Sequence, residues 1–276
     1  MVSPQKAASG VVVYAVLTAI GIFFLAPFLW LVLASVNPSA NLSVSVPHSA
    51  SAGNFDAIMT SAETLRPLLN SLLLSGAAAL LTMIAATLAA YPLSRYSLRF
   101  KKPFMYSILF ATGLPVVALM VPVYGLFVQL HLLDSLPGTI LFLTATSLPI
   151  AIWLTKNFMD GVPLELEEAA WVDGASALRA LRSVVLPLML PGMSVVAIFT
   201  FIMAWGNFFV PFILLLSPSK QPAAVSIFQF FTEYGAVAYG QLAAYSILYS
   251  APVIVLYVFM SRKLGGAFSF GGAVKG

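Results

Sequence analysis

Six long apolar runs constrain this chain more than any other feature of its sequence. A helix needs about 20 consecutive apolar residues to cross the hydrocarbon core of a bilayer, and each run reaches that length. The runs also lack the period-two alternation of membrane β-strands. The sequence therefore predicts an all-α integral membrane protein with six transmembrane helices, at roughly 11–36, 68–92, 104–130, 138–157, 193–217 and 241–261.

The composition of the 276-residue chain agrees with a membrane protein, since 61% of the residues are hydrophobic and only 8% are charged. A soluble domain does not need this much apolar material to fill one core. The sequence has no G-x-x-x-x-G-K-[ST] phosphate loop, and neither His48 nor His131 has a second ligand at metal-binding spacing. We expect a single transmembrane domain over residues 1–276, with no catalytic residue, no metal and no nucleic-acid partner.

The orientation follows from the distribution of Lys and Arg, which are enriched in cytoplasmic loops. With a cytoplasmic N-terminus, one membrane face carries eleven of the thirteen basic residues and the other face carries Arg66 and Lys220. We therefore expect both termini in the cytoplasm and the segment 37–67 outside, beginning at a helix-stopping Asn37-Pro38 pair. The cytoplasmic basic residues are Lys6, Arg95, Arg99, Lys101, Lys102, Lys156, Arg179, Arg182, Arg262, Lys263 and Lys275.

The largest expected cytoplasmic loop, 159–192, is unusually polar for this chain and reads as a helix-turn-helix. Pro163 suits the first turn of a helix, which Gly174 ends by adopting a left-handed conformation. Ser176 is a suitable N-cap for a second short helix, and Pro187 is expected to stop that helix.

Local physics leaves two interpretations of this loop open. The small side chains of Ala169 and Ala170 allow another protein to approach the helix backbone closely. Alternatively, the loop lies along the lipid headgroups, with Arg179 and Arg182 at the phosphates.

The loop resembles the EAA loop of membrane subunits in ATP-binding-cassette (ABC) importers. The matching pattern is Glu-Ala-Ala, three residues, Gly, nine residues, Val, one residue and Leu-Pro, which places the expected ATPase-coupling residues at Glu168, Ala169, Ala170, Asp173, Gly174, Leu186 and Pro187. "NSLLLSG", "AAYPLSRYSLRFKK", "LLDSLPGTIL", "AWGNFFVP" and "GGAVKG" are similar to the second permease subunit of maltose-type carbohydrate importers. One departure is Gly206, which stands between Trp205 and Asn207 where the family usually has Trp-Asn.

The resemblance implies a type I ABC importer permease fold, in which the EAA loop is a cytoplasmic coupling element. It also implies partners: a homologous permease that completes a heterodimer, two ATPase subunits or one ATPase homodimer, and an external sugar-binding protein or lipoprotein. ATP and Mg would be bound by the ATPase, so no cofactor is expected in this chain. The expected location is the cytoplasmic (inner) membrane of a bacterium or archaeon, as a multi-pass protein in contact with membrane lipids.

Two other function classes remain open on the residues alone. An ion-coupled secondary transporter of a neutral solute commonly carries ionisable groups within its spans, and the predicted spans contain no Asp, Glu or Arg. Sodium, however, is also held by the backbone carbonyls of broken helices. A scaffold or assembly factor is not excluded by composition.

Polar groups inside the spans are few and, apart from Lys156 at a membrane end, uncharged, as suits a neutral polyhydroxy solute. The candidates for the substrate pathway are Tyr124, Gln129 and Asn207, with Thr144, Thr146 and Ser147 beside them. Intramembrane Ser and Thr also commonly bond within helices, which is the structural alternative. Prolines inside the spans, such as Pro115, Pro122, Pro149 and Pro211, mark kinks or tolerated bends.

Overall fold

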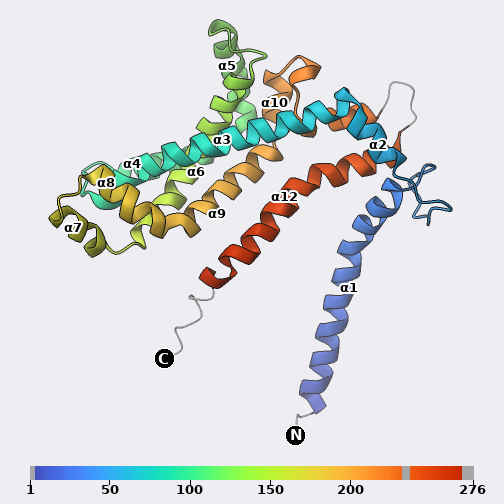
Figure 1. Cartoon of the computed structure of the whole chain (residues 1–276), viewed down its shortest axis with the longest axis horizontal. Coiled ribbons are helices and arrows are strands. Elements are labelled where there is room, and N and C mark those ends of the chain that lie inside the picture. Colours follow the sequence, from blue (N-terminus) through green and yellow to red (C-terminus); the bar gives the residue numbers. More distant parts are fainter. Residues whose placement is uncertain (1–3, 232–236, 269–276) are drawn as a thin grey trace. The chain divides into compact units, whose positions relative to one another are not determined.

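The structure is a computed structural model that describes residues 4–231 and 237–268, and its regular structure is almost entirely helical (Figure 1). The long helices are α1 (Pro4–Ser35), α3 (Ala62–Arg95), α6 (Leu136–Asp160), α9 (Leu186–Trp205) and α12 (Tyr239–Phe268). The shorter elements are α2 (Gly53–Thr60), α4 (Lys101–Thr112), α5 (Val116–Gln129), α7 (Leu164–Val172), α8 (Ala177–Ala180), the π-helical turn η1 (Leu181–Val185), α10 (Phe209–Leu214), the 3-10 turns η2 (Pro218–Lys220) and η3 (Ile227–Phe230), and α11 (Ala223–Ser226).

Among the residues that the structure describes, five helical segments are long and apolar enough to cross a membrane, and α4 with α5 makes a sixth if that bent pair is one span. The second, fourth and sixth predicted spans fall within α3, α6 and α12, and the first matches α1 except for its last residue. Polar residues extend these helices beyond the apolar runs, as at Glu63 and Arg95 of α3. The prediction of an all-helical membrane protein is confirmed.

The third predicted span, 104–130, is bent, as the kink interpretation of its prolines allows. It is broken after Thr112 and resumes at Val116, with an angle of 94° between α4 and α5. Pro115 has no backbone N–H and disfavours a helical conformation in the residue before it, and it adopts an extended conformation here (φ −63°, ψ 120°).

The fifth predicted span, 193–217, is wrong at both ends. The apolar helical segment runs from Ala177 to Trp205, and the later residues form the separate short helix α10. Pro187 does not stop a short helix as expected, because the chain passes from α8 through the π-helical turn η1 into α9. A π-helical turn changes the local hydrogen-bond pattern, which allows a proline without an N–H to be carried in the helix.

The described residues fall into two compact units, and the first contains α1, α2, η3 and the beginning of α12. Its chain leaves α1 just before Asn37-Pro38, as predicted. The Asn54 side chain donates to the backbone carbonyls of Ser35 (3.0 Å) and Asn37 (3.1 Å), which ties α2 to the end of α1. The segment 37–67 is therefore not only a loop, since it contains α2 and the start of α3. The expectation of a single domain stays a prediction.

The second unit contains most of α3, all of α4 to α11 and the later part of α12. Within it, α6 packs against both α4 and α9 (Figure 1). Ala86 of α3, Ala151 of α6 and Val196 of α9 are fully buried in one cluster. Small side chains at these contacts let helix backbones approach closely, which is the usual basis of helix packing in a membrane.

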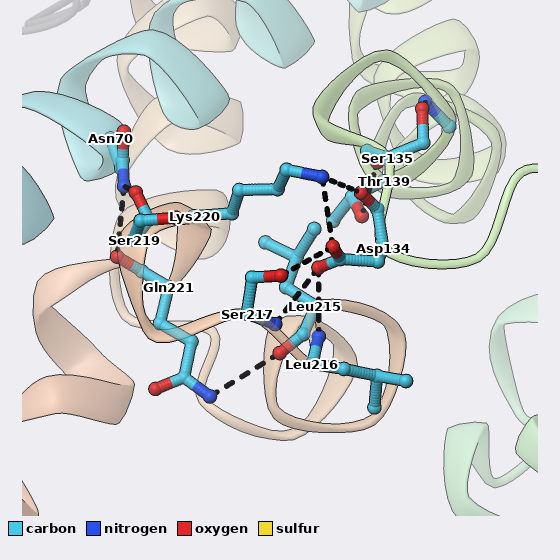
Figure 2. Close-up of polar contacts among 11 residues, drawn as sticks. Asn70, Asp134, Ser135, Thr139, Leu215, Leu216, Ser217, Ser219, Lys220 and Gln221 are labelled. Atoms are coloured by element: carbon cyan, nitrogen blue, oxygen red, sulfur yellow. Dashed lines mark hydrogen bonds and ion pairs between the residues drawn. The ribbon is translucent and has the colours of Figure 1, made fainter.

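A network of hydrogen bonds around Asp134, between α5 and α6, fixes the segment that follows α10 (Figure 2). The Asp134 carboxylate accepts from the backbone N–H of Leu216 (3.0 Å), the N–H and hydroxyl of Ser217 (2.9 and 2.6 Å) and the Lys220 ammonium (2.8 Å). The Asp134 N–H donates to the Leu214 carbonyl at 2.8 Å. Hydrogen bonds from Lys220, and next from Ser217, lower the pKa of Asp134 well below its ordinary value of about 4.

This lowered pKa predicts a pH-dependent stability difference between the wild type and Asp134→Asn. The ionised carboxylate stabilises the folded protein above the unfolded-state pKa, and this stabilisation is lost as the pH falls toward the folded-state pKa. At neutral pH we expect the variant to melt below the wild type in detergent, with the gap narrowing below about pH 4. Asp56→Asn, at an exposed position, is the control. A gap that does not change with pH would contradict this role for Asp134.

Candidate functional site

The loop between α6 and α9 has the predicted helix-turn-helix form at its first turn. Gly174 has a φ of +84°, as expected for a glycine that ends a helix. Its N–H donates to the Trp171 carbonyl (3.0 Å), and the Ala175 N–H donates to the Ala170 carbonyl (2.9 Å). This pair of bonds is a Schellman motif, which satisfies the last carbonyls of α7 and fixes the direction of the following chain.

The second helix of the loop begins at the predicted cap. The Ser176 hydroxyl accepts from the Arg179 N–H at 3.4 Å, and α7 packs against both α8 and η1. Because α8 continues through η1 into α9, the loop is a direct extension of a membrane helix.

A buried polar cluster at the base of the loop was not predicted from the sequence. The Glu167 side chain on α7 is fully buried, and its carboxylate accepts from the Tyr91 hydroxyl and from Arg95 Nε (2.7 Å). Arg95 also donates to the Val162 carbonyl at 3.2 Å. Both oxygens of the carboxylate are thus bonded to side chains of α3, so α3 holds the first helix of the loop.

The predicted coupling residues lie on the outside of this loop. Glu168, Ala169, Asp173, Gly174 and Pro187 are exposed, whereas Ala170 and Leu186 are partly buried. Large apolar side chains accompany them, with Val172 88% and Leu178 68% exposed. Exposed apolar and acidic groups on a folded loop are typical of a surface that contacts another molecule.

A cavity of about 570 Å³ lies where helices of the second unit are broken. Its lining is apolar apart from four uncharged polar residues, Thr112, Thr146, Ser147 and Asn207. Thr112 is the last residue of α4, and Asn207 follows the end of α9. Non-helical backbone at membrane depth is tolerated where it lines a cavity, so both helix breaks are consistent with this lining.

Of the predicted pathway residues, the structure places Asn207 in the cavity lining, and Tyr124 and Gln129 are not among the residues that line it. The Asn207 Oδ1 accepts from the Val210 N–H at 3.0 Å, which caps α10. Its amide also has N–H donors that suit a solute oxygen. Thr144 donates to the Ile140 carbonyl (2.8 Å) and Thr146 to the Leu143 carbonyl (3.1 Å), as the structural alternative expects. Thr112 is a lining residue that sequence reasoning missed.

Comparison with known proteins identifies the family. Residues 78–265 match the family model for the binding-protein-dependent transport system inner membrane component. This chain belongs to that family. A putative ABC transporter permease protein of Streptomyces antibioticus is 35% identical over 207 residues, which is 75% of this chain and 90% of that protein. The family is a component of transport systems, so the chain is a transport subunit embedded in a membrane.

Named relatives of this permease cover most of its length. It is 28% identical to the trehalose transport system permease protein SugB of Mycobacterium tuberculosis, over 92% of this chain and 93% of that protein. It is also 28% identical to the sulfoquinovosyl glycerol transport system permease protein SmoH of Agrobacterium fabrum, over 89% of this chain and 87% of the relative.

The fold of the permease matches a chain in the crystal structure of a bacterial ABC transporter that imports the acidic polysaccharide alginate. The TM-score is 0.84 at 20% sequence identity, and the match covers 95% of this chain and 99% of the other. The predicted ABC importer permease fold is therefore confirmed.

Proposed function

We propose that this permease is one of two membrane subunits of an ATP-driven sugar importer and that its α7–α8 loop couples ATPase motion to the pore. The observation that carries the proposal is the exposed helix-turn-helix of this family member, with Glu168 and Gly174 at its surface. The partners are a homologous permease, a pair of ATPase subunits that bind ATP and Mg, and an external sugar-binding protein.

Charge on the loop favours protein docking over a position along the headgroups. Glu165, Glu168 and Asp173 are all exposed on or next to α7, and they outnumber the exposed Arg179 and Arg182 of α8 and η1. The cytoplasmic leaflet has a negative surface potential, which repels such acidic groups. A basic cleft in an ATPase subunit instead attracts them, and the exposed Val172 and Leu178 supply apolar area to bury.

The solute is an uncharged sugar or glycoside in this proposal. The cavity offers hydroxyl and amide groups with apolar walls and no charged side chain among its lining residues. Neutral hydrogen-bonding groups suit a polyhydroxy solute, and apolar walls suit its C–H faces. Several relatives are named as transporters of sugars, including the diacetylchitobiose uptake system permease protein NgcG of Streptomyces coelicolor.

The decisive experiment reconstitutes the permease in proteoliposomes with the products of its neighbouring transport genes. We expect ATP hydrolysis that rises when the binding protein and its sugar are added, together with ATP-dependent uptake of that sugar. Uptake driven by an ion gradient without ATP would refute the proposal. Preferential uptake of an anionic solute would refute its uncharged-sugar part.

Both termini are placed in the cytoplasm in this proposal, and cysteine labelling tests that orientation. The wild-type chain has no cysteine, so single substitutions give an unambiguous signal. Ser51, Ser97 and Ser176 are all exposed. We expect cysteines at Ser97 and Ser176 to react only from the cytoplasmic side, and one at Ser51 only from outside. External labelling at Ser176 would overturn the orientation.

A further inference from the structure

Helix α3 is attached near both ends by buried polar side chains. At one end, Tyr91 and Arg95 hold Glu167 of the coupling loop, as described above. This group is called the Arg95 clamp. At the other end, Asn70 and Ser71 hold the segment 219–223, and this group is called the Asn70 clamp.

The Arg95 clamp resists any sliding of α7 along α3. The side chains of Glu167 and Arg95 are 0% and 5% exposed. Separating this ion pair would leave two charges buried without a partner, which is strongly unfavourable. The clamp also bridges Pro92, where α3 lacks a backbone N–H, because Tyr91 and Arg95 lie on either side of it. The clamp thus makes α7 and the end of α3 move together.

The Asn70 clamp is built from neutral groups, and Figure 2 shows the part made by Asn70. The Asn70 amide donates to the carbonyls of Ser219 (3.0 Å) and Gln221 (3.1 Å). The Ser71 hydroxyl accepts from the Ala223 N–H at 2.8 Å. Asn70 and Ser71 are 8% and 1% exposed, so these bonds have little competition from solvent. The segment they hold is further bonded to Asp134 through Lys220.

Between the two clamps, α3 is packed along its length. Leu74 and Ala78 belong to one buried cluster, Ala86 to a second, and Ala90 to a third. The rise of 1.5 Å per residue places Asn70 and Arg95 about 38 Å apart, which is enough to cross a bilayer core of about 30 Å. A continuous, tightly packed helix of this length moves as one body.

We propose that α3 transmits movement of the coupling loop to the segment 219–223 at the opposite membrane face, with Glu167, Arg95 and Asn70 as positioning residues. This inference rests on the proposed function, since it requires an ATPase that moves the loop. It assigns the transmission to a specific element with two clamps, each of which can be broken alone. A coupling route of this kind is established only by showing that both ends respond together.

The experiment uses the whole reconstituted transporter, with a fluorophore on a cysteine at Ser219 as the reporter. Ser219 is exposed, and the chain has no other cysteine. In the wild type we expect a fluorescence change on adding a non-hydrolysable ATP analogue. Asn70→Leu, far from the loop, should retain ATPase association and basal hydrolysis, while the reporter response and the sugar transported per ATP fall by about fivefold or more. Glu167→Gln should lower the same two readouts in the transporter that assembles. A purely structural role would lower only the amount of assembled transporter.

Controls separate the clamps from general damage. Glu63→Gln makes the same chemical change at an exposed position of α3 that belongs to neither clamp, and it should match the wild type. Arg95→Lys keeps the charge but not the donor geometry of Arg, so its loss should be smaller than that of Arg95→Gln. If the Glu167→Gln variant fails to assemble, the Asn70→Leu variant alone tests the transmission, because Asn70 lies far from the loop.

The outcomes also distinguish the two proposals. A wild type without sugar-stimulated ATPase activity and without ATP-dependent uptake would refute the functional basis, and the transmission with it. A wild type with both activities whose reporter never responds to nucleotide would refute the transmission alone. A wild type with sugar-stimulated ATPase activity, beside an Asn70→Leu variant with an unchanged reporter response and unchanged transport per ATP, would refute the transmission through α3 alone.

Discussion

Gly174→Ala is expected to leave the permease in the membrane but to reduce its association with the ATPase roughly 5- to 30-fold. Gly174 has a φ of +84°, and a residue with a Cβ pays about 1–2 kcal/mol for that conformation. A Cβ there would meet nothing within 4 Å, so the cost arises in the backbone and not from a clash. Relief of this strain turns α8 away from α7 and changes the docking surface. Co-purification of the ATPase with the tagged permease measures the loss.

Gly161→Ala is the matched control for this substitution. Gly161 also ends a helix, α6, but with a φ of −77°, which any residue adopts. We expect ATPase recovery at the wild-type level. Glu168→Lys provides a second test, since it reverses an exposed charge on α7 without changing the turn. If Gly174→Ala and Glu168→Lys both recover as much ATPase as the wild type, the loop is not the coupling element and a position along the headgroups becomes the better interpretation.

The features predicted correctly from the sequence are those that depend on residues close together along the chain. A run of apolar residues long enough to span a bilayer must be helical there, so the existence of the spans follows from length and hydropathy. The turn at Gly174 and the cap at Ser176 follow from backbone preferences of single residues. Both were therefore visible without knowledge of the tertiary structure.

The helix breaks were harder to predict because proline alone does not determine them. Pro122 and Pro149 lie inside α5 and α6, and those helices continue through them. The break at Pro115 has Gly113 two residues before it, so poor helix formation coincides with the missing N–H. At the end of α9 the break has a different cause, because the Asn207 side chain caps the new helix α10. In this chain a proline breaks a span where a second helix-weakening residue lies beside it, as Gly113 does beside Pro115.

The Arg95 clamp could not be predicted from local pattern. Glu167 and Arg95 are 72 residues apart, and each has an ordinary local explanation. Arg95 fits the positive charge of a cytoplasmic helix end, and Glu167 fits the first turn of α7. Only the fold shows that Glu167 is buried while the neighbouring Glu168 is exposed. The difference follows from the packing of α7 against η1, which turns one face of α7 inward.

Gly192→Val is expected to destabilise the permease by about 1–3 kcal/mol or more, because α6 and α9 approach too closely for a side chain there. A Cβ at Gly192 would lie 2.5, 2.7 and 2.8 Å from Cγ, Cδ1 and Cβ of Phe158. These atoms are near the Phe158 backbone, so the ring cannot swing aside and the helices must separate. We expect a lower melting temperature in detergent and reduced sugar uptake, since α6 and α9 both line the cavity. Gly125→Val is the control, because a Cβ at that helical glycine meets nothing within 4 Å. Equal melting temperatures for Gly192→Val and the wild type would show that α6 and α9 do not pack this closely.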